Sequence, residues 1–400
     1  MKKIFKPLSL WFTLSILVMV GFNACKKDKN NYGTGAPVIT KVRTLTKNDS
    51  VLINHPINLD SSITYPEVRP MPFDSTTNSG KIYTLYAIIG KNLGTTKHIY
   101  INDTEIYFNI ALATDNSIIF SIPETVPFSG STTSNKLKLV TSYGQISYDF
   151  VIEQPFPGIT DVDHMAGNAG DLITITGTTF DGLSSVKIGT TSAEIVSKTS
   201  TKIVAKVPAG LTGPGDLSIT TTATLGGGTA KGPIASNGIN LSIPNNNSAT
   251  FGLYPFGFSQ AIYEDGFKNG WSNYGWSNSP DNGNTSPVVR GTSSIKVQYA
   301  GGYDGYVFQA PGNIAAKSFK MSVYGGKGSD NKVIHIVLDY NFNNAVAIVL
   351  KEGAWTNFNI PLTAFVNTGA TAPKTINSII FQEFSGTATL FYLDDVGLIQ

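Results

Sequence analysis

The chain has 400 residues and nearly balanced charge, with 29 Lys and Arg against 27 Asp and Glu. Charged residues make up only 14% of it, well below the share of about a quarter that is typical of soluble domains. No basic cluster follows the N-terminal 30 residues, so the composition argues against nucleic-acid binding, which rests on dense Lys and Arg contacts to phosphates. A neutral, hydroxyl-rich ligand fits this composition better.

The N-terminus is typical of an export signal. Lysines precede an uncharged apolar run over residues 8–20, which is shorter than the roughly 20 residues of a membrane-spanning helix. Cys25 is the only cysteine, which excludes an intramolecular disulfide, and it follows the small residue Ala24. That order suits a lipoprotein signal peptidase, so we expect removal of residues 1–24 and stable anchoring through acyl chains on Cys25. The alternative is a free thiol inside an ordinary signal peptide.

The residues that follow the signal point to the cell surface. The sequence Cys-Lys-Lys-Asp-Lys at 25–29 resembles the short charged tag that directs some Gram-negative lipoproteins to the outer leaflet of the outer membrane. The resemblance implies an exported outer-membrane lipoprotein that faces the cell exterior and contacts membrane lipid through Cys25.

The rest of the sequence has the pattern of antiparallel strands. Short runs of alternating apolar residues are bounded by Gly, Pro, Asn or Asp, and no segment keeps helical spacing over several turns. We therefore predict an all-β chain of sandwiches. Proline-containing segments at 155–158 and 244–247 interrupt the pattern and mark boundaries. The predicted parts are a tether at 25–35 and domains at 36–154, 155–244 and 245–400.

The two domains before residue 244 share a strand pattern. In the second, apolar strands at 172–180, 186–189, 203–208 and 217–220 end in Gly, Pro or polar residues, and the first has similar strands in the same order. This pattern resembles the immunoglobulin-like IPT/TIG domain, closely over most of 157–243 and more loosely in the first copy, which carries an insertion around 54–80. The resemblance implies spacer domains, and we assign them no chemistry.

The segment 250–400 differs because it holds the last three tryptophans of the chain and a loop-like Gly-Trp-Ser-Asn-Tyr-Gly-Trp sequence. Aromatic rings combine an apolar face with a polar handle and therefore suit the C–H faces and hydroxyls of sugars. The candidate ligand-binding residues are Trp271, Tyr274, Trp276, Tyr303 and Tyr306 for stacking, and Asp304 as a hydrogen-bond acceptor. About half of these rings could instead pack in the core, and Trp271 is the tryptophan for which this is most expected.

The last domain resembles the jelly-roll, galactose-binding-like carbohydrate-binding modules attached to polysaccharide-degrading enzymes. The strands that carry the resemblance are at 332–339, 355–362, 379–382 and 391–396. The resemblance implies that Trp355 packs in the core. Gln382 is a further ligand-binding candidate, although strand alternation allows it to face either side.

In that family a structural calcium often joins the first strand to the last. The resemblance implies Glu264 and Asp394 as its ligands, with Asp395 as an alternative to Asp394. Calcium takes six to eight oxygen ligands, so solvated surface acids are an equal alternative. No other cofactor is expected.

The combination of lipoprotein signal, IPT/TIG-like spacers and terminal jelly roll resembles the surface glycan-binding proteins of polysaccharide-utilisation systems. It implies non-catalytic capture of a neutral plant- or algal-type polysaccharide, presented to glycanases and a TonB-dependent importer. Two alternatives stay open. An enzyme needs a nucleophile, a metal-ligand motif or paired carboxylates, and none rises above chance here. An adhesin or structural surface protein would use the same aromatic face to bind a protein or matrix partner.

Overall fold

The computed structural model describes residues 32–58, 61–232, 234–236, 250–253, 255–276, 278–301, 303–366 and 371–400. The expected signal peptide and Cys25 lie outside these residues. Helix in the described part is confined to three single 3-10 turns, η1 (Ile110–Leu112), η2 (Phe342–Asn344) and η3 (Leu362–Ala364), so none of its helices is long enough to cross a membrane. The all-β prediction is confirmed.

The chain divides into two compact units. The first contains the described residues up to 127 and 133–152, and the second contains 128–132 and 153–400. The first unit has four-stranded sheets in the orders β2-β1-β4-β7 and β6-β5-β8-β9, and a short β10-β3 pair. Its strands are β1 (Val38–Asn58), β2 (Ser61–Thr77), β3 (Ser79–Gly80), β4 (Leu85–Lys91), β5 (Thr96–Ile101), β6 (Thr104–Ile106), β7 (Ser117–Ser121), β8 (Lys136–Thr141), β9 (Gly144–Asp149) and β10 (Val151–Ile152).

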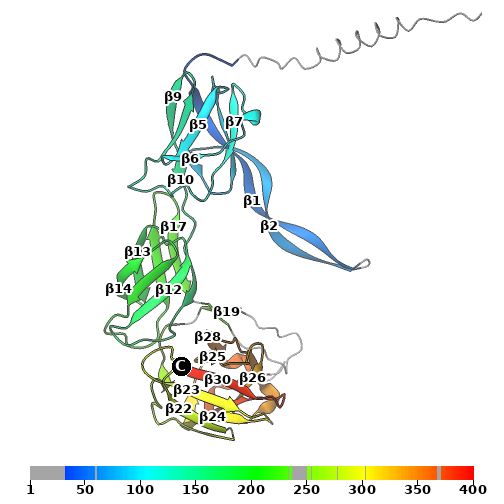
Figure 1. The fold of residues 1–400 in the computed structure, drawn as a ribbon, viewed down its shortest axis with the longest axis vertical. Coiled ribbons are helices and arrows are strands. Elements are labelled where there is room, and N and C mark those ends of the chain that lie inside the picture. Colours follow the sequence, from blue (N-terminus) through cyan, green and yellow to red (C-terminus); the bar gives the residue numbers. More distant parts are fainter. Residues whose placement is uncertain are drawn as a thin grey trace, which may run out of the picture. The chain divides into compact units, whose positions relative to one another are not determined.

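Alternation buries one side of each sheet in this unit. Ile118 of β7, Ile99 of β5 and Leu139 of β8 are fully buried between exposed or half-buried neighbours. The hairpin of β1 and β2 continues well beyond this core (Figure 1), with a register running from Val42 opposite Thr77 to Asn58 opposite Ser61. The predicted insertion around 54–80 therefore contains the whole of β2, the returning strand of this hairpin.

The first part of the second unit is a seven-stranded sheet in the order β11-β12-β15-β14-β13-β16-β17. β14 pairs with both β13 and β15, and it thereby joins the two layers around a core that includes Ile175, Val186 and Ile219. The strands are β11 (Gly158–Val162), β12 (Leu172–Thr178), β13 (Leu183–Ile188), β14 (Thr191–Lys198), β15 (Lys202–Lys206), β16 (Leu217–Thr222) and β17 (Gly227–Gly232).

The remainder of the second unit, here called the C-terminal sandwich, packs an eight-stranded sheet against a five-stranded one. The larger sheet has the order β19-β18-β28-β25-β30-β23-β22, with β20 also paired to β30, and the smaller has the order β21-β24-β29-β26-β27. The strands are β18 (Ile234–Ser236), β19 (Thr250–Leu253), β20 (Gln260–Tyr263), β21 (Ser272–Gly275), β22 (Asn278–Asn284), β23 (Ser294–Tyr299), β24 (Gly305–Ala315), β25 (Ser318–Gly325), β26 (Val333–Leu338), β27 (Val346–Val349), β28 (Trp355–Pro361), β29 (Thr375–Gln382) and β30 (Thr389–Ile399).

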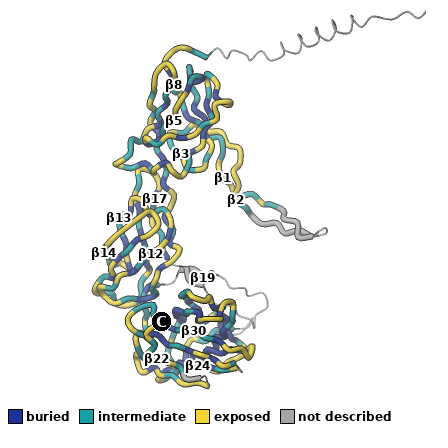
Figure 2. Tube along the Cα trace, viewed as in Figure 1, coloured by how far each residue is buried: buried dark blue, intermediate teal, exposed yellow. Residues whose placement is uncertain are grey.

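Buried residues in the C-terminal sandwich gather along its strands, and exposed residues follow its loops (Figure 2). The core between the two sheets is rich in aromatic rings, which pack edge to face at centroid distances such as 5.7 Å for Phe308 and Phe381. This geometry favours ring pairs beyond their buried area. The core fixes the smaller sheet so that its other side, which we call the outer face, is turned away from the larger sheet.

The C-terminal sandwich and the preceding sheet share structural elements. The chain leaves β17 and enters β18, which pairs with β28 of the larger sheet. Farther along, Phe256 returns to the core of the preceding sheet, where it is 1% exposed, and its backbone exchanges hydrogen bonds of 2.8 and 2.9 Å with Gly215. Residues 153–400 consequently form one compact unit.

Candidate functional site

The outer face of the five-stranded sheet has an aliphatic floor. Strand alternation decides its members: in β24, Tyr306 and Phe308 are in the core, so Val307 between them lies on the outer face. The register places Tyr274 opposite Val307, Val307 opposite Ile380, and Ile380 opposite Val337, in one row across four strands. Although these residues lie on the outside of the sandwich, the floor residues Val307, Val337 and Ile380 are 0% exposed.

Exposed aromatic residues gather around this floor. Their side chains remain open to solvent, with exposed fractions of 45% for Tyr274, 41% for Trp276, 57% for Tyr303, 46% for Tyr340 and 40% for Phe342. Tyr274 comes from the edge strand β21 and Tyr340 follows β26, yet their hydroxyls are hydrogen-bonded to each other. The pair therefore reaches across the floor from its two sides. We call these five residues the aromatic face.

Trp276 and Tyr303 are fixed to each other. The Trp276 indole Nε1 donates to the Tyr303 carbonyl oxygen at 2.7 Å, and the Gln382 amide donates to the same oxygen at 2.8 Å. The indole lies over Gly305, where a Cβ would meet its ring atoms at 2.5 Å. A glycine is thus required for this close approach.

Two tyrosines of the aromatic face have a backbone conformation that bulky residues rarely adopt. Tyr303 has φ of +66°, and Asp339 and Tyr340 have φ of +50° and +62°. The Asn341 amide donates to the Leu338 carbonyl at 2.9 Å, so residues 338–341 form a tight turn whose two central residues are left-handed, which normally calls for Gly, Asn or Asp. Such strain costs about 1–3 kcal/mol per residue and is concentrated at functional sites.

Phe384 extends the ring surface, and the buried His335 supports it. Their rings stack at 4.0 Å with 7° between planes, and Phe384 lies 6.5 Å from Tyr303. Burial lowers the pKa of His335, with the charge of Glu383 opposing the shift. The imidazole is therefore neutral at physiological pH. Because His335 is only 7% exposed, it supports the Phe384 ring that stacks on it and adds no surface of its own.

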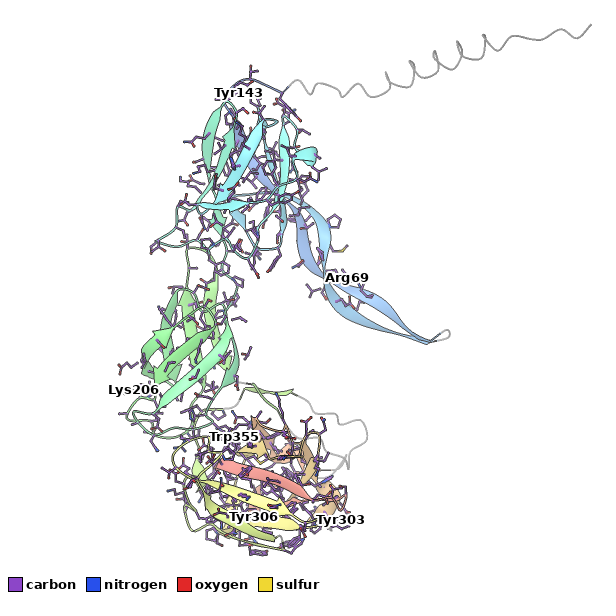
Figure 3. The ribbon with its side chains drawn as sticks, viewed as in Figure 1. Arg69, Tyr143, Lys206, Tyr303, Tyr306 and Trp355 are labelled. Atoms are coloured by element: carbon purple, nitrogen blue, oxygen red, sulfur yellow. The ribbon has the colours of Figure 1, made fainter. Side chains whose placement is uncertain are left out.

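The prediction that Trp271 and Tyr306 stack on a ligand is wrong. Tyr306 is 0% exposed and Trp271 is 3% exposed, and both belong to the core between the sheets. The Tyr306 hydroxyl donates to Asn282 at 3.1 Å. Figure 3 labels Tyr303 at the rim of the C-terminal sandwich and Tyr306 on the strand itself.

Three other predicted side chains are placed as follows. Asp304 accepts from the Ala300 amide at 2.7 Å and closes its own loop, while Gln382 is 8% exposed and holds the Tyr303 carbonyl. Both side chains support the loop of the aromatic face. Trp355 is half-buried rather than a core residue. It lies in the larger sheet, where it packs at 5.4 Å on its neighbour Tyr324 of β25.

Sequence reasoning missed Tyr340 and Phe342. They stand in the run Asp-Tyr-Asn-Phe-Asn-Asn at 339–344, where two rings alternate with small polar residues. This is the same signal that singled out Trp276, so it could have found them.

The residues proposed for calcium do not fit that ion. Arg290 occupies the position between the acids: its guanidinium donates to Glu264 at 2.5 Å and to Asp395 at 2.8 and 3.0 Å. The Asp394 oxygens accept from the Val289 and Asp395 amides at 2.9 and 2.8 Å. Within the described ranges, no group of three or more His, Cys, Asp or Glu residues is placed to hold a metal.

This cluster is instead a buried ion-pair network. Asp395 is 1% exposed and Arg290 is 10% exposed. Burial raises the pKa of Asp395 while the Arg290 charge opposes the shift, and burial together with the Asp395 charge raises the pKa of Asp394 to about 7. Arg290 supplies the positive charge that the resemblance assigned to calcium.

The same side of the C-terminal sandwich is bound to the preceding sheet. The His164 imidazole Nε2 lies 3.0 Å from the Val289 carbonyl oxygen and its Nδ1 lies 2.6 Å from Asp163. The Lys320 side chain is fully buried, and burial lowers its pKa to about 7 while the Asp395 charge opposes the shift. Its ammonium donates to three backbone carbonyls, those of Met165 (3.1 Å), Pro255 (2.6 Å) and Gly257 (2.8 Å).

Residues 157–235 match the family model described as the IPT/TIG domain. This confirms the predicted resemblance for the second domain. A curated relative from Bacteroides ovatus, named an IPT/TIG domain-containing protein, is 28% identical over 193 residues. The match covers 48% of this chain and 35% of that protein, so the chain spans about a third of the relative's length.

Solved structures are similar over most of the chain or over about a third of it. A surface glycan-binding protein of Prevotella bryantii is 16% identical, with 91% of this chain and 99% of that chain covered and a TM-score of 0.48. A protein from a xyloglucan utilization locus of Bacteroides uniformis has the same identity and coverage, with a TM-score of 0.37. A family 11 carbohydrate-binding module of Clostridium thermocellum is 17% identical, covers 35% of this chain and 94% of its own, and has a TM-score of 0.28.

Proposed function

We propose that this protein binds a neutral polysaccharide at the aromatic face without cutting it. The observation that carries the proposal is the set of exposed rings around the floor of the five-stranded sheet, with Trp276 and Tyr303 held in place by shared hydrogen bonds. Exposed rings are normally scattered, whereas a cluster on one face marks a binding site. Rings with polar handles suit sugars, which present C–H faces edged by hydroxyls.

The surroundings of the rings favour a neutral ligand. His335 is uncharged at physiological pH because burial lowers its pKa. The Glu383 carboxylate accepts from the Ser385 hydroxyl and from the backbone amides of Ser385 and Thr387. Burial raises its pKa, but these hydrogen bonds outweigh burial and lower it, so the carboxylate is charged and disfavours an acidic ligand. The aliphatic floor is buried beneath the rings, so the surface available to a partner is aromatic rather than aliphatic. This favours a sugar chain over the protein partner of an adhesin.

The proposal includes a location and a purpose. The N-terminal sequence resembles a lipoprotein signal, and a lipid on Cys25 would anchor the protein to the outer membrane with the glycan-binding domain at the other end of the chain. Anchored copies would bind one polysaccharide together, so avidity would offset weak single sites. We propose that the captured chain is passed to neighbouring glycanases and a TonB-dependent importer.

Tryptophan fluorescence tests the binding site directly. Trp276 is the indole on the aromatic face, while Trp271 is buried and Trp355 lies on the other sheet. Titration of the chain from residue 26 onward with soluble neutral polysaccharides should shift its emission, and Trp276→Phe should remove the shift. An emission change that persists in Trp276→Phe would place binding elsewhere, and no change with any polysaccharide would count against glycan binding.

A further inference from the structure

Three loops of the first unit lie beside the point where the chain enters it. The Gly33 amide donates to the Asp115 carboxylate at 2.9 Å, and the Leu93 amide donates to the Asp115 carbonyl at 3.0 Å. The Ser142 amide donates to the Thr95 carbonyl at 3.1 Å. These contacts put the loops before β5, before β7 and after β8 at one end of the unit, together with the first described residues. We call it the entry end.

Exposed apolar side chains gather at the entry end. Ile110 and Leu112, in the 3-10 turn η1 that leads into the loop before β7, are 67% and 55% exposed. Tyr143, in the turn after β8, is 49% exposed, and Val38, the first residue of β1, is 46% exposed. Figure 3 labels Tyr143 at the end of the unit where the described chain begins. Exposed apolar residues that gather in one place, rather than lying singly, indicate an interaction surface.

The sequence places a membrane close to the entry end. Seven residues, 26–32, separate Gly33 from Cys25, the residue that we propose to carry lipid. A fully extended chain spans at most about 3.6 Å per residue, so Gly33 lies within about 29 Å of the lipid-bearing residue. A lipid surface is therefore always within reach of the entry end.

The chemistry of the entry end fits a lipid surface. Aliphatic side chains insert at the boundary between headgroups and acyl chains, and tyrosine is enriched there because its ring is apolar and its hydroxyl polar. Lys91, which pairs with Val38, and Lys97, near the start of β5, are both exposed, and lysines beside a membrane attract anionic headgroups. A polysaccharide would need several exposed rings, whereas Tyr143 is the ring among these four apolar residues.

We propose that the entry end docks on the outer leaflet of the outer membrane, with Ile110, Leu112 and Tyr143 inserted at headgroup level. The inference rests on the lipid anchor of the proposed function and goes beyond it by adding a second membrane contact. A lipid at the end of a tether leaves the protein free to turn, whereas the added contact holds the first unit in one orientation on the membrane.

An environment-sensitive dye tests the docking. Cys25 is the only cysteine of the chain, and its thiol is blocked when it carries lipid, so an introduced cysteine can be labelled alone. Leu112→Cys would be labelled with NBD in the lipid-modified protein, reconstituted on vesicles of phosphatidylethanolamine and phosphatidylglycerol. Leu52→Cys is the matched control, because Leu52 is 70% exposed and lies on the part of the β1–β2 hairpin that continues beyond the core.

The dye at residue 112 should emit at a shorter wavelength than the dye at residue 52. It should be quenched severalfold more by nitroxide-labelled lipid and severalfold less by iodide in the water phase. Ile110→Ser combined with Tyr143→Ser should remove most of this difference. In the chain from residue 26 onward without vesicles, iodide should quench both dyes alike. Equal iodide quenching of the two dyes on vesicles would overturn the docking.

The docking and the proposed function fail in different ways. If mass spectrometry finds no lipid on Cys25 and the protein stays out of the membrane fraction, the proposed location and the docking are both wrong. If Cys25 carries lipid and the two dyes respond alike on vesicles, only the docking is wrong. Polysaccharide binding at the aromatic face is measured with the chain from residue 26 onward and depends on neither result.

Discussion

The Trp276 indole donates a hydrogen bond of 2.7 Å to the carbonyl oxygen of Tyr303, which lies 27 residues farther along the chain. This bond uses the polar edge of one exposed ring to fix the backbone that carries another. Gln382 reinforces it from β29 by donating to the same oxygen. Rings that are fixed before binding lose little freedom when a ligand stacks on them, and such preorganisation raises affinity.

Gly305→Ala should weaken polysaccharide binding without unfolding the protein. A Cβ at this position meets the Trp276 ring at 2.5 Å and displaces the indole, whereas Gly312 in the same strand has open space around its Cβ position. We expect about a tenfold rise in Kd for Gly305→Ala, equivalent to about 1.4 kcal/mol, and none for Gly312→Ala. Isothermal titration with the retained polymer measures both. Unchanged affinity in Gly305→Ala would show that the indole position does not matter.

Tyr340→Gly should separate stability from binding. Glycine adopts the left-handed conformation without strain, so the variant should keep or raise the melting temperature while its affinity falls about five- to tenfold through loss of one stacking ring. Thermal unfolding and titration of one preparation provide the two values. Tyr107→Gly is the comparison, since Tyr107 is an exposed tyrosine without positive φ in the first unit. A lower melting temperature in Tyr340→Gly would contradict the strain argument.

The sequence predicted the all-β fold and three of the five residues of the aromatic face. The two wrong stacking predictions, Trp271 and Tyr306, are explained by which side of its strand each residue faces. Because side chains alternate along a strand, Tyr274 and Trp276 lie on the same side of β21, whereas Trp271 lies on the opposite side and points into the core. That distinction required recognising β21 as a strand, and its Ser, Asn and Gly residues resemble a loop. Tyr306 was misplaced for the same reason, because the start of β24 was not evident from the sequence.

Other features depend on tertiary structure. The left-handed turn at Asp339 and Tyr340 contains no glycine, so local sequence did not reveal it. The role of Arg290 was missed because the search for a calcium site considered acids alone, and only folding brings Glu264 and Asp395 to the same guanidinium.

Arg290→Met should destabilise the second unit severely. The variant leaves the buried Asp395 carboxylate without its cation, and removal of one partner of a buried pair typically costs about 3–5 kcal/mol. The control is Lys231→Met, whose exposed pair with Asp216 at 2.8 Å should contribute about 0–1 kcal/mol. Urea unfolding measures both losses.

Calcium should not substitute for Arg290. Because the guanidinium lies between the acids, addition of calcium or of a chelator should leave the melting temperature of the wild-type protein unchanged. A rise in melting temperature with calcium would show that the acids bind the ion after all.

His164→Gln should destabilise the protein more in acid than in base. Burial opposes protonation of His164, but the hydrogen bond and charge of Asp163, together with the charge of Asp395, outweigh it and raise the histidine pKa above 6.5. The charged form therefore contributes stability that is fully present below the unfolded-state pKa and is lost as pH rises through the higher folded-state pKa.

The melting temperatures of wild type and His164→Gln should accordingly differ most near pH 5.5, by about 2–4 °C for each 1 kcal/mol lost. They should converge near about pH 8.5, where the imidazole is neutral in both states. A difference that is constant with pH would mean that the interaction of His164 with Asp163 does not depend on its charge.

The most direct test of polysaccharide binding at the aromatic face is affinity electrophoresis of the chain from residue 26 onward through gels that contain neutral polysaccharides. Wild type and the control Tyr107→Ala should be retarded by at least one polymer, and Trp276→Ala should migrate as in a gel without polysaccharide. Retardation of Trp276→Ala equal to that of wild type, or free migration of wild type in every gel, would contradict the account.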